Sequence, residues 1–581
     1  MTSPLEPHAL PFNPPSYATL GIAITAFLLV LVYRLALPKP IPGIPYDAAA
    51  ARSILGSMPQ MNAFRKVNDN RLLLWFAKQA ETNRWPISQF WFPFSKPSII
   101  LADYREVQDI LLRRTKEFGR DHRTRDLFAN TTPEFHVALL SEDPKYKINK
   151  SLVKDIMSPT FLQNVSSQQV YRKCTFLIDL WRFKLEAAKG IAFDASEDIF
   201  SALSDTITGA AYALNDDMST VRQRSQYLRS FDGNIPLRID EHGAVEFPDL
   251  PPLPYYEAFR ILSDHQGDQQ RAGFPALAHH FEMLTQPQLR WAYKTVHDFE
   301  AREIQKSIAR VEADANNLTS ALDYIVMREL QIATNEGRKP NFYQRRIFDE
   351  MSGYYMAGHE TSATTVSWAV KFIAQHAEVQ EKLRLALRTS FPAAVQENRQ
   401  PTVTEIMKAN VPYLMAVIDE TLRMRPPFGI IAREALVDTV LLGHKIPKGT
   451  TIMMPSFGPS LHSPALPIPE EVRSESSRTK QWGHDWAPED IHLFKPERWL
   501  KVDEEKAEVV HDPQAGPMQS FGLGPRQCFG KRLAYVQLRA FITLLVWNFK
   551  FHNVEGRWGL NDVAELVTSR PKYCYVKLEA V

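Results

Sequence analysis

A long stretch without proline, from Asn341 to about His376, constrains the fold of this 581-residue chain most strongly. Apolar residues recur along it at the spacing of one helix face, namely Ile347, Met351, Tyr354, Tyr355, Val366, Ala369, Val370 and Ile373. Such a helix has about ten turns of 5.4 Å and can cross a whole domain. The stretch therefore predicts a large helical body.

Two further helices and several short strands follow from the same patterns. The segment "VPYLMAVIDETLRMRPP" predicts a helix that stops at Pro426-Pro427, and Gly530–Phe549 predicts another. Runs rich in β-formers occupy 97–103, 438–454 and the C-terminal "KYCYVKLEA". No internal repeat divides residues 47–581, so we expect one mainly α domain with small β-sheets. The proline-broken segment 232–259 and the polar segment 463–483 are expected to be insertions.

The composition is that of a globular protein, with 44% hydrophobic and 23% charged residues. A formal net charge of +2 gives no indication of a nucleic-acid partner, and we expect none. Cys174, Cys528 and Cys574 are too few and too scattered for a disulfide framework, which fits a reducing compartment.

The N-terminal segment predicts a membrane anchor. Tyr17–Tyr33 is free of charge and is followed by Arg34 and Lys39. A cleaved signal peptide is the alternative, but no basic segment precedes the apolar run and no small-residue cleavage site follows it. We therefore expect a transmembrane helix over 17–37, a non-cytosolic tail over 1–16 and a cytosolic body. The proline-rich segment 38–46 predicts a stiff hinge.

The decapeptide "FGLGPRQCFG" (521–530) surrounds Cys528 with glycine, proline and arginine. Glycine lets a backbone approach a flat ligand closely. Cys528 lies just before a predicted helix, where unpaired N–H groups stabilise a thiolate and lower its pKa. Such a thiolate is either a nucleophile or a soft metal ligand. A nucleophile needs a His base, which the linear sequence does not identify.

The segment "MAGHETSATT" (356–365) places Gly358 inside the longest predicted helix. One interpretation is a tolerated glycine followed by a glutamate that faces solvent. The other is a local opening of the helix that leaves room for a small ligand, with Glu360 and Thr361 as a proton relay. Nearer the C-terminus, Glu420 and Arg423 are three residues apart on one helix face, a pair that is common and weak on its own.

Together these segments resemble the cytochrome P-450 (haem-thiolate) family, over about residues 40–581. The family pattern F-x-x-G-x-R-x-C-x-G is met by Phe521, Gly524, Arg526, Cys528 and Gly530. The oxygen-binding helix pattern is met by Ala357, Gly358, Glu360 and Thr361, the ExxR pair by Glu420 and Arg423, and the PER motif by Pro496, Glu497 and Arg498. All four motifs occur in the family's order.

The resemblance implies roles for these residues. Cys528 would be the axial thiolate of the iron of haem b, Gly530 would let the next helix approach the ring, and Phe521 would pack beside the thiolate. Thr361 would hydrogen-bond dioxygen, and Glu360 would supply protons. Glu420, Arg423 and Arg498 would form a buried structural triad.

Cations for the haem propionates are implied at Arg526 and Arg433. A third family position, a Trp and an Arg on an early helix, falls here on Tyr146 and Lys150. This is a departure from the family pattern, because an ammonium lacks the planar fork of a guanidinium. Lys147, Lys150 and Lys154 lie on one face of this early helix. Together with Lys531, they would face an acidic redox partner.

The resemblance implies a monooxygenase anchored in the endoplasmic reticulum membrane, with its catalytic domain in the cytosol. It would insert one atom of dioxygen into a lipophilic small molecule, as fungal enzymes of secondary metabolism do. Because no flavin or nicotinamide domain follows, electrons from NADPH would come through NADPH-cytochrome P-450 reductase, with cytochrome b5 as a further donor. The alternatives are a haem-thiolate isomerase or dehydratase that does not use dioxygen, and a haem sensor or electron carrier.

Overall fold

The computed structural model describes residues 17–272, 274–480 and 483–581. The predicted central helix is α15 (Arg345–Gln375), an unbroken helix of 31 residues. Before it come α1 (Tyr17–Ala36), α2 (Met58–Val67), α3 (Leu72–Asn83), α4 (Tyr104–Leu112), α5 (His122–Ala129), α6 (Pro144–Leu152), α7 (Pro159–Phe161), α8 (Ser167–Ala188), α9 (Ser196–Tyr212), α10 (Thr220–Arg229), α11 (Pro254–Arg271), α12 (Pro275–Thr285), α13 (Pro287–Ala313) and α14 (Ala321–Asn335). After it come α16 (Ala377–Ser390), α17 (Pro392–Gln396), α18 (Val403–Lys408), α19 (Pro412–Met424), α20 (Glu475–Thr479) and α21 (Lys531–Asn548).

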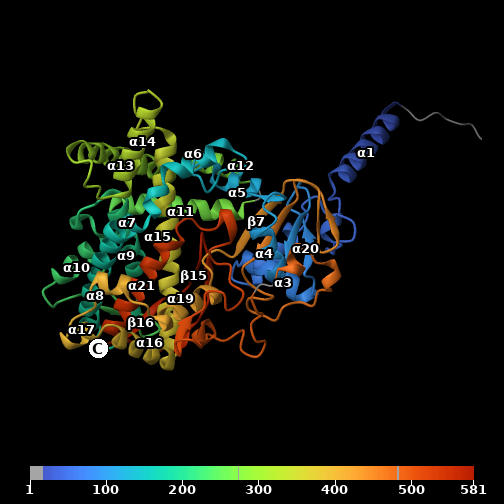
Figure 1. Cartoon of the computed structure of the whole chain (residues 1–581). Coiled ribbons are helices and arrows are strands. Elements are labelled where there is room, and N and C mark those ends of the chain that lie inside the picture. The colour runs from blue at the N-terminus through green and yellow to red at the C-terminus, as the bar shows by residue number, and fades with distance from the viewer. Residues whose placement is uncertain (1–16, 273, 481–482) are drawn as a thin grey trace, which may run out of the picture.

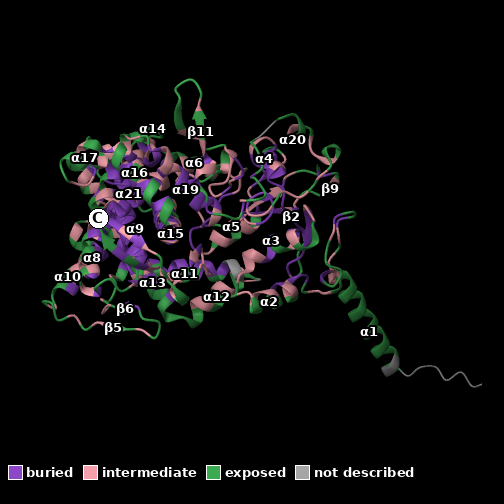
Figure 2. Ribbon diagram, turned by 90° about the horizontal axis from the view of Figure 1, so that it is seen from below, coloured by how far each residue is buried: buried purple, intermediate pink, exposed green. Residues whose placement is uncertain are grey.

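Helix α15 runs through the α-rich side of the molecule and packs against α9, α19 and α21 (Figure 1). Two large clusters of buried apolar side chains lie along it, one including Val366 and Trp368, the other Met351 and Tyr355. Figure 2 shows these buried residues gathered around α9, α15 and α21. The two sequence-predicted helices next in the chain are confirmed as α19, which ends before Pro426-Pro427, and α21.

In the described ranges, the strands form two five-stranded sheets and three hairpins. One sheet has the order β1 (Ile87–Phe90), β2 (Ser98–Leu101), β10 (Thr451–Pro455), β7 (Ile430–Ala435) and β3 (Phe118–Gly119). The other has the order β13 (Phe549–His552), β16 (Tyr575–Ala580), β4 (Phe193–Asp194), β6 (Val245–Glu246) and β5 (Arg238–Ile239). The hairpins are β8 (Thr439–Leu441) with β9 (His444–Ile446), β11 (Leu500–Asp503) with β12 (Glu508–His511), and β14 (Val563–Glu565) with β15 (Ser569–Pro571). The predicted mainly α architecture with small sheets is therefore confirmed.

The two expected insertions have structure of their own. Segment 232–259 contributes β5 and β6 to the second sheet and ends in the first turns of α11. Segment 463–483 contains α20, which packs on α4. The Ser474 and Ser476 hydroxyls both donate to Oδ2 of Asp109 on α4, at 2.6 and 2.8 Å.

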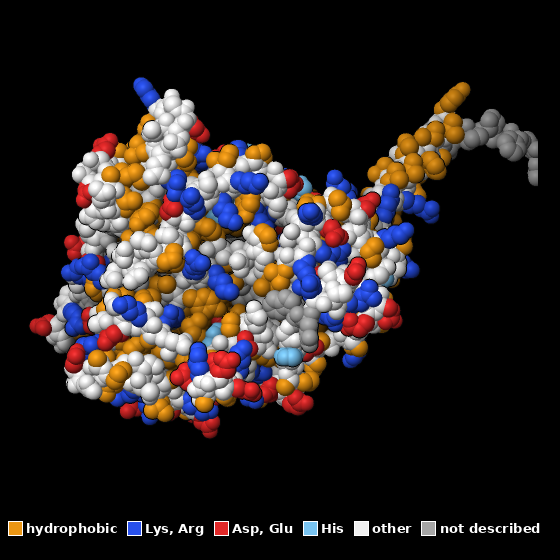
Figure 3. Space-filling view, viewed as in Figure 1, with side chains coloured by type: hydrophobic (Ala, Val, Ile, Leu, Met, Phe, Trp, Pro, Cys, Tyr) orange, Lys and Arg blue, Asp and Glu red, His pale blue; other side chains and the backbone are white. Residues whose placement is uncertain are grey.

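Helix α1 projects from the body and carries exposed apolar side chains (Figures 1 and 3). Its bounds agree with the helix predicted over 17–37. Within the three described ranges, no helix is both long enough and apolar enough to cross a membrane. The tail predicted for 1–16 lies outside the described residues.

Candidate active site

The loop that carries Cys528 is shaped by close backbone contacts. Gly522 and Gly524 have backbone φ angles of 61° and 70°, which residues other than glycine rarely adopt. A Cβ at Gly524 would lie 2.0 Å from the Leu111 carbonyl oxygen on α4. The Cys528 N–H donates to the Phe521 carbonyl at 2.7 Å, which closes the loop immediately before α21. The chain therefore presents Cys528 from a constrained turn, as the sequence predicts.

Cys528 retains accessible surface, whereas Cys174 and Cys574 are fully buried. Even so, protein atoms surround the Cys528 side chain closely enough that burial raises the pKa of its thiol. The Gly530 N–H and the Lys531 ammonium offset only part of this effect. The lowered pKa predicted from the helix N-terminus is therefore wrong for the protein alone, because burial outweighs the helix end. A coordinated metal cation deprotonates a thiol outright.

The segment 356–365, which the resemblance assigns to oxygen binding, lies in the middle of α15. Ala357 is exposed, although residues 353–355 before it and His359 and Glu360 after it are buried. The Thr361 hydroxyl donates to the Ala357 carbonyl at 2.8 Å. A Cβ at Gly358 would lie 2.8 Å from Cδ1 of Ile207, so glycine here allows α9 to pack closely. The predicted local opening of the helix is not observed, because α15 is continuous through Gly358.

Glu360 points into the protein and not into solvent. It is 6% exposed, and both carboxylate oxygens accept hydroxyl hydrogen bonds. Ser263 Oγ on α11 donates to Oε2 at 2.5 Å, and Thr568 Oγ1 donates to Oε1 at 3.1 Å. The interpretation of Glu360 as a solvent-facing residue is therefore wrong, and two distant segments hold its carboxylate in place.

Three arginines gather near the cysteine loop: Arg526 from the loop, Arg433 from β7 and Arg120 immediately after β3. Burial lowers the pKa of Arg120 to about 9, with further lowering from the charges of Arg526 and Arg433. Burial likewise lowers the pKa of Arg433 to about 10, where the Arg526 charge also contributes. Burial lowers the pKa of Arg526 as well.

These three cations lack carboxylate partners. None of them forms a salt bridge within the described part of the chain, and there Nη1 of Arg526 and Nε of Arg120 are buried without a hydrogen-bond acceptor. Positive charges that are concentrated and partly desolvated without a counter-ion are costly. It fits a ligand that carries two carboxylates, as the haem propionates do, so the residues present suit the group that the sequence implies.

Sequence reasoning missed Arg120 as a member of this cluster. It belongs to no motif, and only the pairing of β3 with β7, Phe118 opposite Ala435, brings it beside Arg433. The predicted Tyr146 and Lys150 do join this cluster. Lys150 Nζ donates to the Tyr146 hydroxyl at 3.2 Å, and the Arg526 guanidinium lies 4.0 Å from the Tyr146 ring centroid. Burial would raise the pKa of Tyr146, but Lys150 and Arg526 together lower it.

The predicted structural triad is assembled around Glu420. Arg423 donates to it at 2.8 and 2.7 Å and Arg498 at 3.0 Å, and all three side chains are at most 5% exposed. Trp499 Nε1 and the Lys495 N–H add two more hydrogen bonds, each of 2.9 Å.

Phe521, at the start of the cysteine loop, packs on Tyr535, with ring centroids 5.4 Å apart. The Lys531 ammonium lies over the Phe521 ring, 5.5 Å from its centroid.

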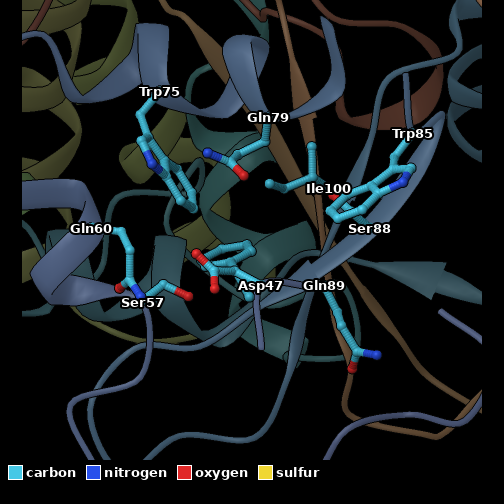
Figure 4. A pocket seen from close by; sticks show the side chains of 10 residues that line it. Asp47, Ser57, Gln60, Trp75, Gln79, Trp85, Ser88, Gln89 and Ile100 are labelled. Atoms are coloured by element: carbon cyan, nitrogen blue, oxygen red, sulfur yellow. The ribbon is translucent and has the colours of Figure 1, made fainter. Parts of the chain in front are cut away.

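Two cavities lie apart from these residues. One of about 10 Å³ is enclosed by side chains including Trp75, Trp85 and Gln60 and holds at most about one water molecule (Figure 4). The other, of about 670 Å³, is a groove between segment 472–479 and β8. Neither is lined by any residue predicted to act in the site, so neither is the candidate active site.

An accessible cysteine on a constrained loop, an unpaired arginine cluster and a central helix with an acid–alcohol pair together define a haem-thiolate protein. The comparisons agree: the sequence model described as Cytochrome P450 matches residues 86–475 and 489–576. The chain belongs to the cytochrome P450 family, its cofactor is haem b, and it is an oxidoreductase that incorporates oxygen.

Three relatives that match nearly the whole chain are fungal. Cytochrome P450 monooxygenase TRI13 of Fusarium sporotrichioides is 33% identical, over 97% of this chain and 99% of its own length. Cytochrome P450 monooxygenase xilC of Penicillium rubens is 32% identical, over 97% and 96%. Cytochrome P450 monooxygenase GME11363 of Pestalotiopsis microspora is 30% identical, over 97% and 99%. The family predicted from the sequence is therefore confirmed.

Proposed function

We propose that this protein is a fungal secondary-metabolism monooxygenase that inserts one atom of dioxygen into a lipophilic small molecule. Cys528 ligates the haem iron, and the bound haem supplies the activation of dioxygen. Arg120, Arg433 and Arg526 hold the propionates, with help from Tyr146 and Lys150. The observation that carries this proposal is the accessible Cys528 thiol on a loop beside a partly buried arginine cluster that lacks carboxylate partners.

Thr361 and Glu360 transfer protons on the face of α15 that carries the exposed Ala357. The Thr361 hydroxyl can turn from the Ala357 carbonyl and donate its proton to a ligand. Glu360 then supplies a proton to replace the one that Thr361 has donated. Phe521 shields the thiolate, and Gly530, the residue immediately before α21, places no side chain toward the ring. The buried, hydrogen-bonded Glu360 favours this proposal over an isomerase or dehydratase that does not use dioxygen, which has less need of a proton relay. The names of the full-length relatives as monooxygenases speak against a sensor or an electron carrier.

The reaction is tested by expressing the chain with a fungal reductase and supplying a metabolite extract, NADPH and ¹⁸O₂. We expect new products that carry one ¹⁸O atom, with the other atom released as water. Products that form equally well without dioxygen would support the isomerase or dehydratase.

Electrons come from a separate NADPH-cytochrome P-450 reductase, or from cytochrome b5, at the cysteine side of the protein. Lys147 is exposed on α6, and Lys154 is exposed in the turn that follows, since α6 ends at Leu152. Lys531 begins α21. Exposed cations steer an acidic partner at low ionic strength. Lys147→Glu and Lys531→Glu should slow reductase-driven turnover and flatten its salt dependence, and unchanged values would contradict this docking surface.

Helix α1 attaches the enzyme to the endoplasmic reticulum membrane, with the catalytic domain in the cytosol and residues 1–16 on the opposite side. Ile22 and Phe27 on α1 are 70% and 67% exposed, which favours burial in lipid. The test is carbonate extraction of the full chain and of a variant that lacks residues 1–37. We expect only the full chain in the membrane pellet. Protease protection of an N-terminal tag then distinguishes a spanning helix from one that lies on the surface.

A further inference from the structure

Three segments that are far apart in the sequence converge on Glu360. These are α15, α11 through Ser263, and the loop before β15 through Thr568. Thr568 has one hydroxyl hydrogen and donates it to Glu360, so it accepts from Thr364 at 2.7 Å. The three hydroxyl groups are buried together with the carboxylate. Glu360 is therefore an acceptor at both oxygens.

The approach of α11 to the Thr568 loop depends on a glycine. Gly267 lies one turn beyond Ser263 on α11, and a Cβ there would lie 3.1 Å from the Val567 nitrogen and 3.2 Å from the Leu566 carbonyl carbon. The loop is fixed on its other side, since the Trp368 indole donates to the Ser569 carbonyl at 2.9 Å. The Ser569 N–H donates to the Pro427 carbonyl at 2.9 Å. Close packing against α11 and two hydrogen bonds on the other side therefore fix the loop that holds Glu360.

Titratable groups on each of the three segments face this site. Asp264 follows Ser263 on α11 and is half-exposed at the surface. Burial raises the pKa of Asp264, the Glu360 charge adds to this, and the charges of Arg570, beyond the loop, and Arg260 oppose it. Burial lowers the pKa of His359, which precedes Glu360 on α15. Asp268, one turn after Asp264, also raises the pKa of Asp264.

We propose that Ser263 and Thr568 are positioning residues for Glu360, and that Ser263 Oγ is the step through which protons from the solvent side of α11 reach it. A proton from Asp264 or from water is accepted by Ser263 Oγ, while the Ser263 hydroxyl proton moves to Glu360 Oε2. The net change is one proton transferred, with no oxidation or reduction. Thr568 holds Oε1 and so fixes the orientation of the carboxyl group. This inference rests on the proposed function of Glu360.

The test uses the haem-loaded full chain with reductase, NADPH and dioxygen, without an added substrate. We expect Ser263→Ala and Thr568→Val to lower dioxygen consumption roughly ten-fold, part of the 10²–10⁴-fold that a positioned proton donor contributes. The solvent deuterium isotope effect should rise, and the pH profile should shift. Ser263→Thr and Thr568→Ser keep the hydroxyl and should restore each value. Ser204→Ala is the matched control, because this buried serine also bonds a side chain of α15, the Tyr355 hydroxyl at 2.7 Å.

A second readout does not depend on turnover. The infrared carboxylate band that Glu360→Gln removes should shift in Ser263→Ala and stay in place in Ser204→Ala. If Ser263→Ala does not fold, Ser263→Cys, which keeps the volume with a weak donor, should show the same loss. A wild-type isotope effect and an unshifted band in the Ser263 and Thr568 variants would overturn the proposal. If Glu360→Gln itself had no effect, the proposed function of Glu360 would fail instead, so the two failures are distinguishable.

Discussion

Removing the Glu420 carboxylate should destabilise the protein far more than removing a surface carboxylate of the same geometry. Glu420 accepts two hydrogen bonds from Arg423, one from Arg498, one from Trp499 and one from the Lys495 N–H. Glu420→Ala leaves two guanidinium groups facing each other where side chains are at most 5% exposed. Losing one partner of a buried pair costs about 3–5 kcal/mol.

The Trp499 indole N–H and the Lys495 N–H also lose their acceptor, which adds about 1 kcal/mol to the loss of stability once water enters the space that the side chain leaves. The sum is about 4–6 kcal/mol. With an unfolding entropy of about 2.1 cal/mol/K per residue over roughly 500 residues, this lowers the Tm by about 4–6 °C. The assay is thermal unfolding of the haem-loaded protein followed by circular dichroism.

The chain contains a matched control in Glu257 and Arg260. This pair has the same three-residue spacing and is also doubly hydrogen-bonded, at 2.9 and 2.6 Å, but its arginine side chain is 53% exposed. Exposed pairs contribute about 0–1 kcal/mol, so Glu257→Ala should shift the Tm by about 1 °C or less. If Glu420→Ala lowers the Tm no more than Glu257→Ala does, the argument from burial is refuted.

Three further predictions concern the cysteine loop, the arginine cluster and Glu300, a buried glutamate on α13. Gly524→Ala places a Cβ 2.0 Å from the Leu111 carbonyl at a φ of 70°, so haem content after purification should drop sharply, and a full complement would contradict this steric argument. Arg433→Met removes the buried member of the three arginines that lack carboxylate partners, so haem should transfer faster to apomyoglobin, and an unchanged rate would show that Arg433 does not hold haem. Burial raises the pKa of Glu300 to about 8, so the folded state keeps a proton that the unfolded state loses above about pH 4.5, and stability falls as pH rises between these values. Glu300→Gln should flatten that part of the urea-unfolding profile, and an unaltered slope would assign it to another group.

The long-range part of the site could not be predicted from the sequence. Helices α15, α19 and α21 follow from local signals, namely proline placement and apolar spacing, and the motif residues follow from the family pattern. Arg120 depends on the pairing of β3 with β7, and Ser263 and Thr568 lie 97 and 208 residues from Glu360. No local signal connects residues at such separations.

Two predictions failed because packing outweighed a local rule. Gly358 is destabilising in a helix interior, which favoured a local opening, but it is explained by close contact with Ile207 on α9. Cys528 lies near a helix N-terminus, which favours a low pKa, but burial raises the pKa of the thiol. Both effects come from neighbours that only the folded chain supplies.

The central claim, that Cys528 ligates the haem iron, is tested most directly by the carbon monoxide difference spectrum of the reduced protein. Wild type should show the red-shifted Soret band of a thiolate-ligated haem. Cys528→Ala should lose that band, while Cys174→Ala, at a buried cysteine away from the loop, should keep it. A thiolate-type band that persists in Cys528→Ala would contradict the assignment.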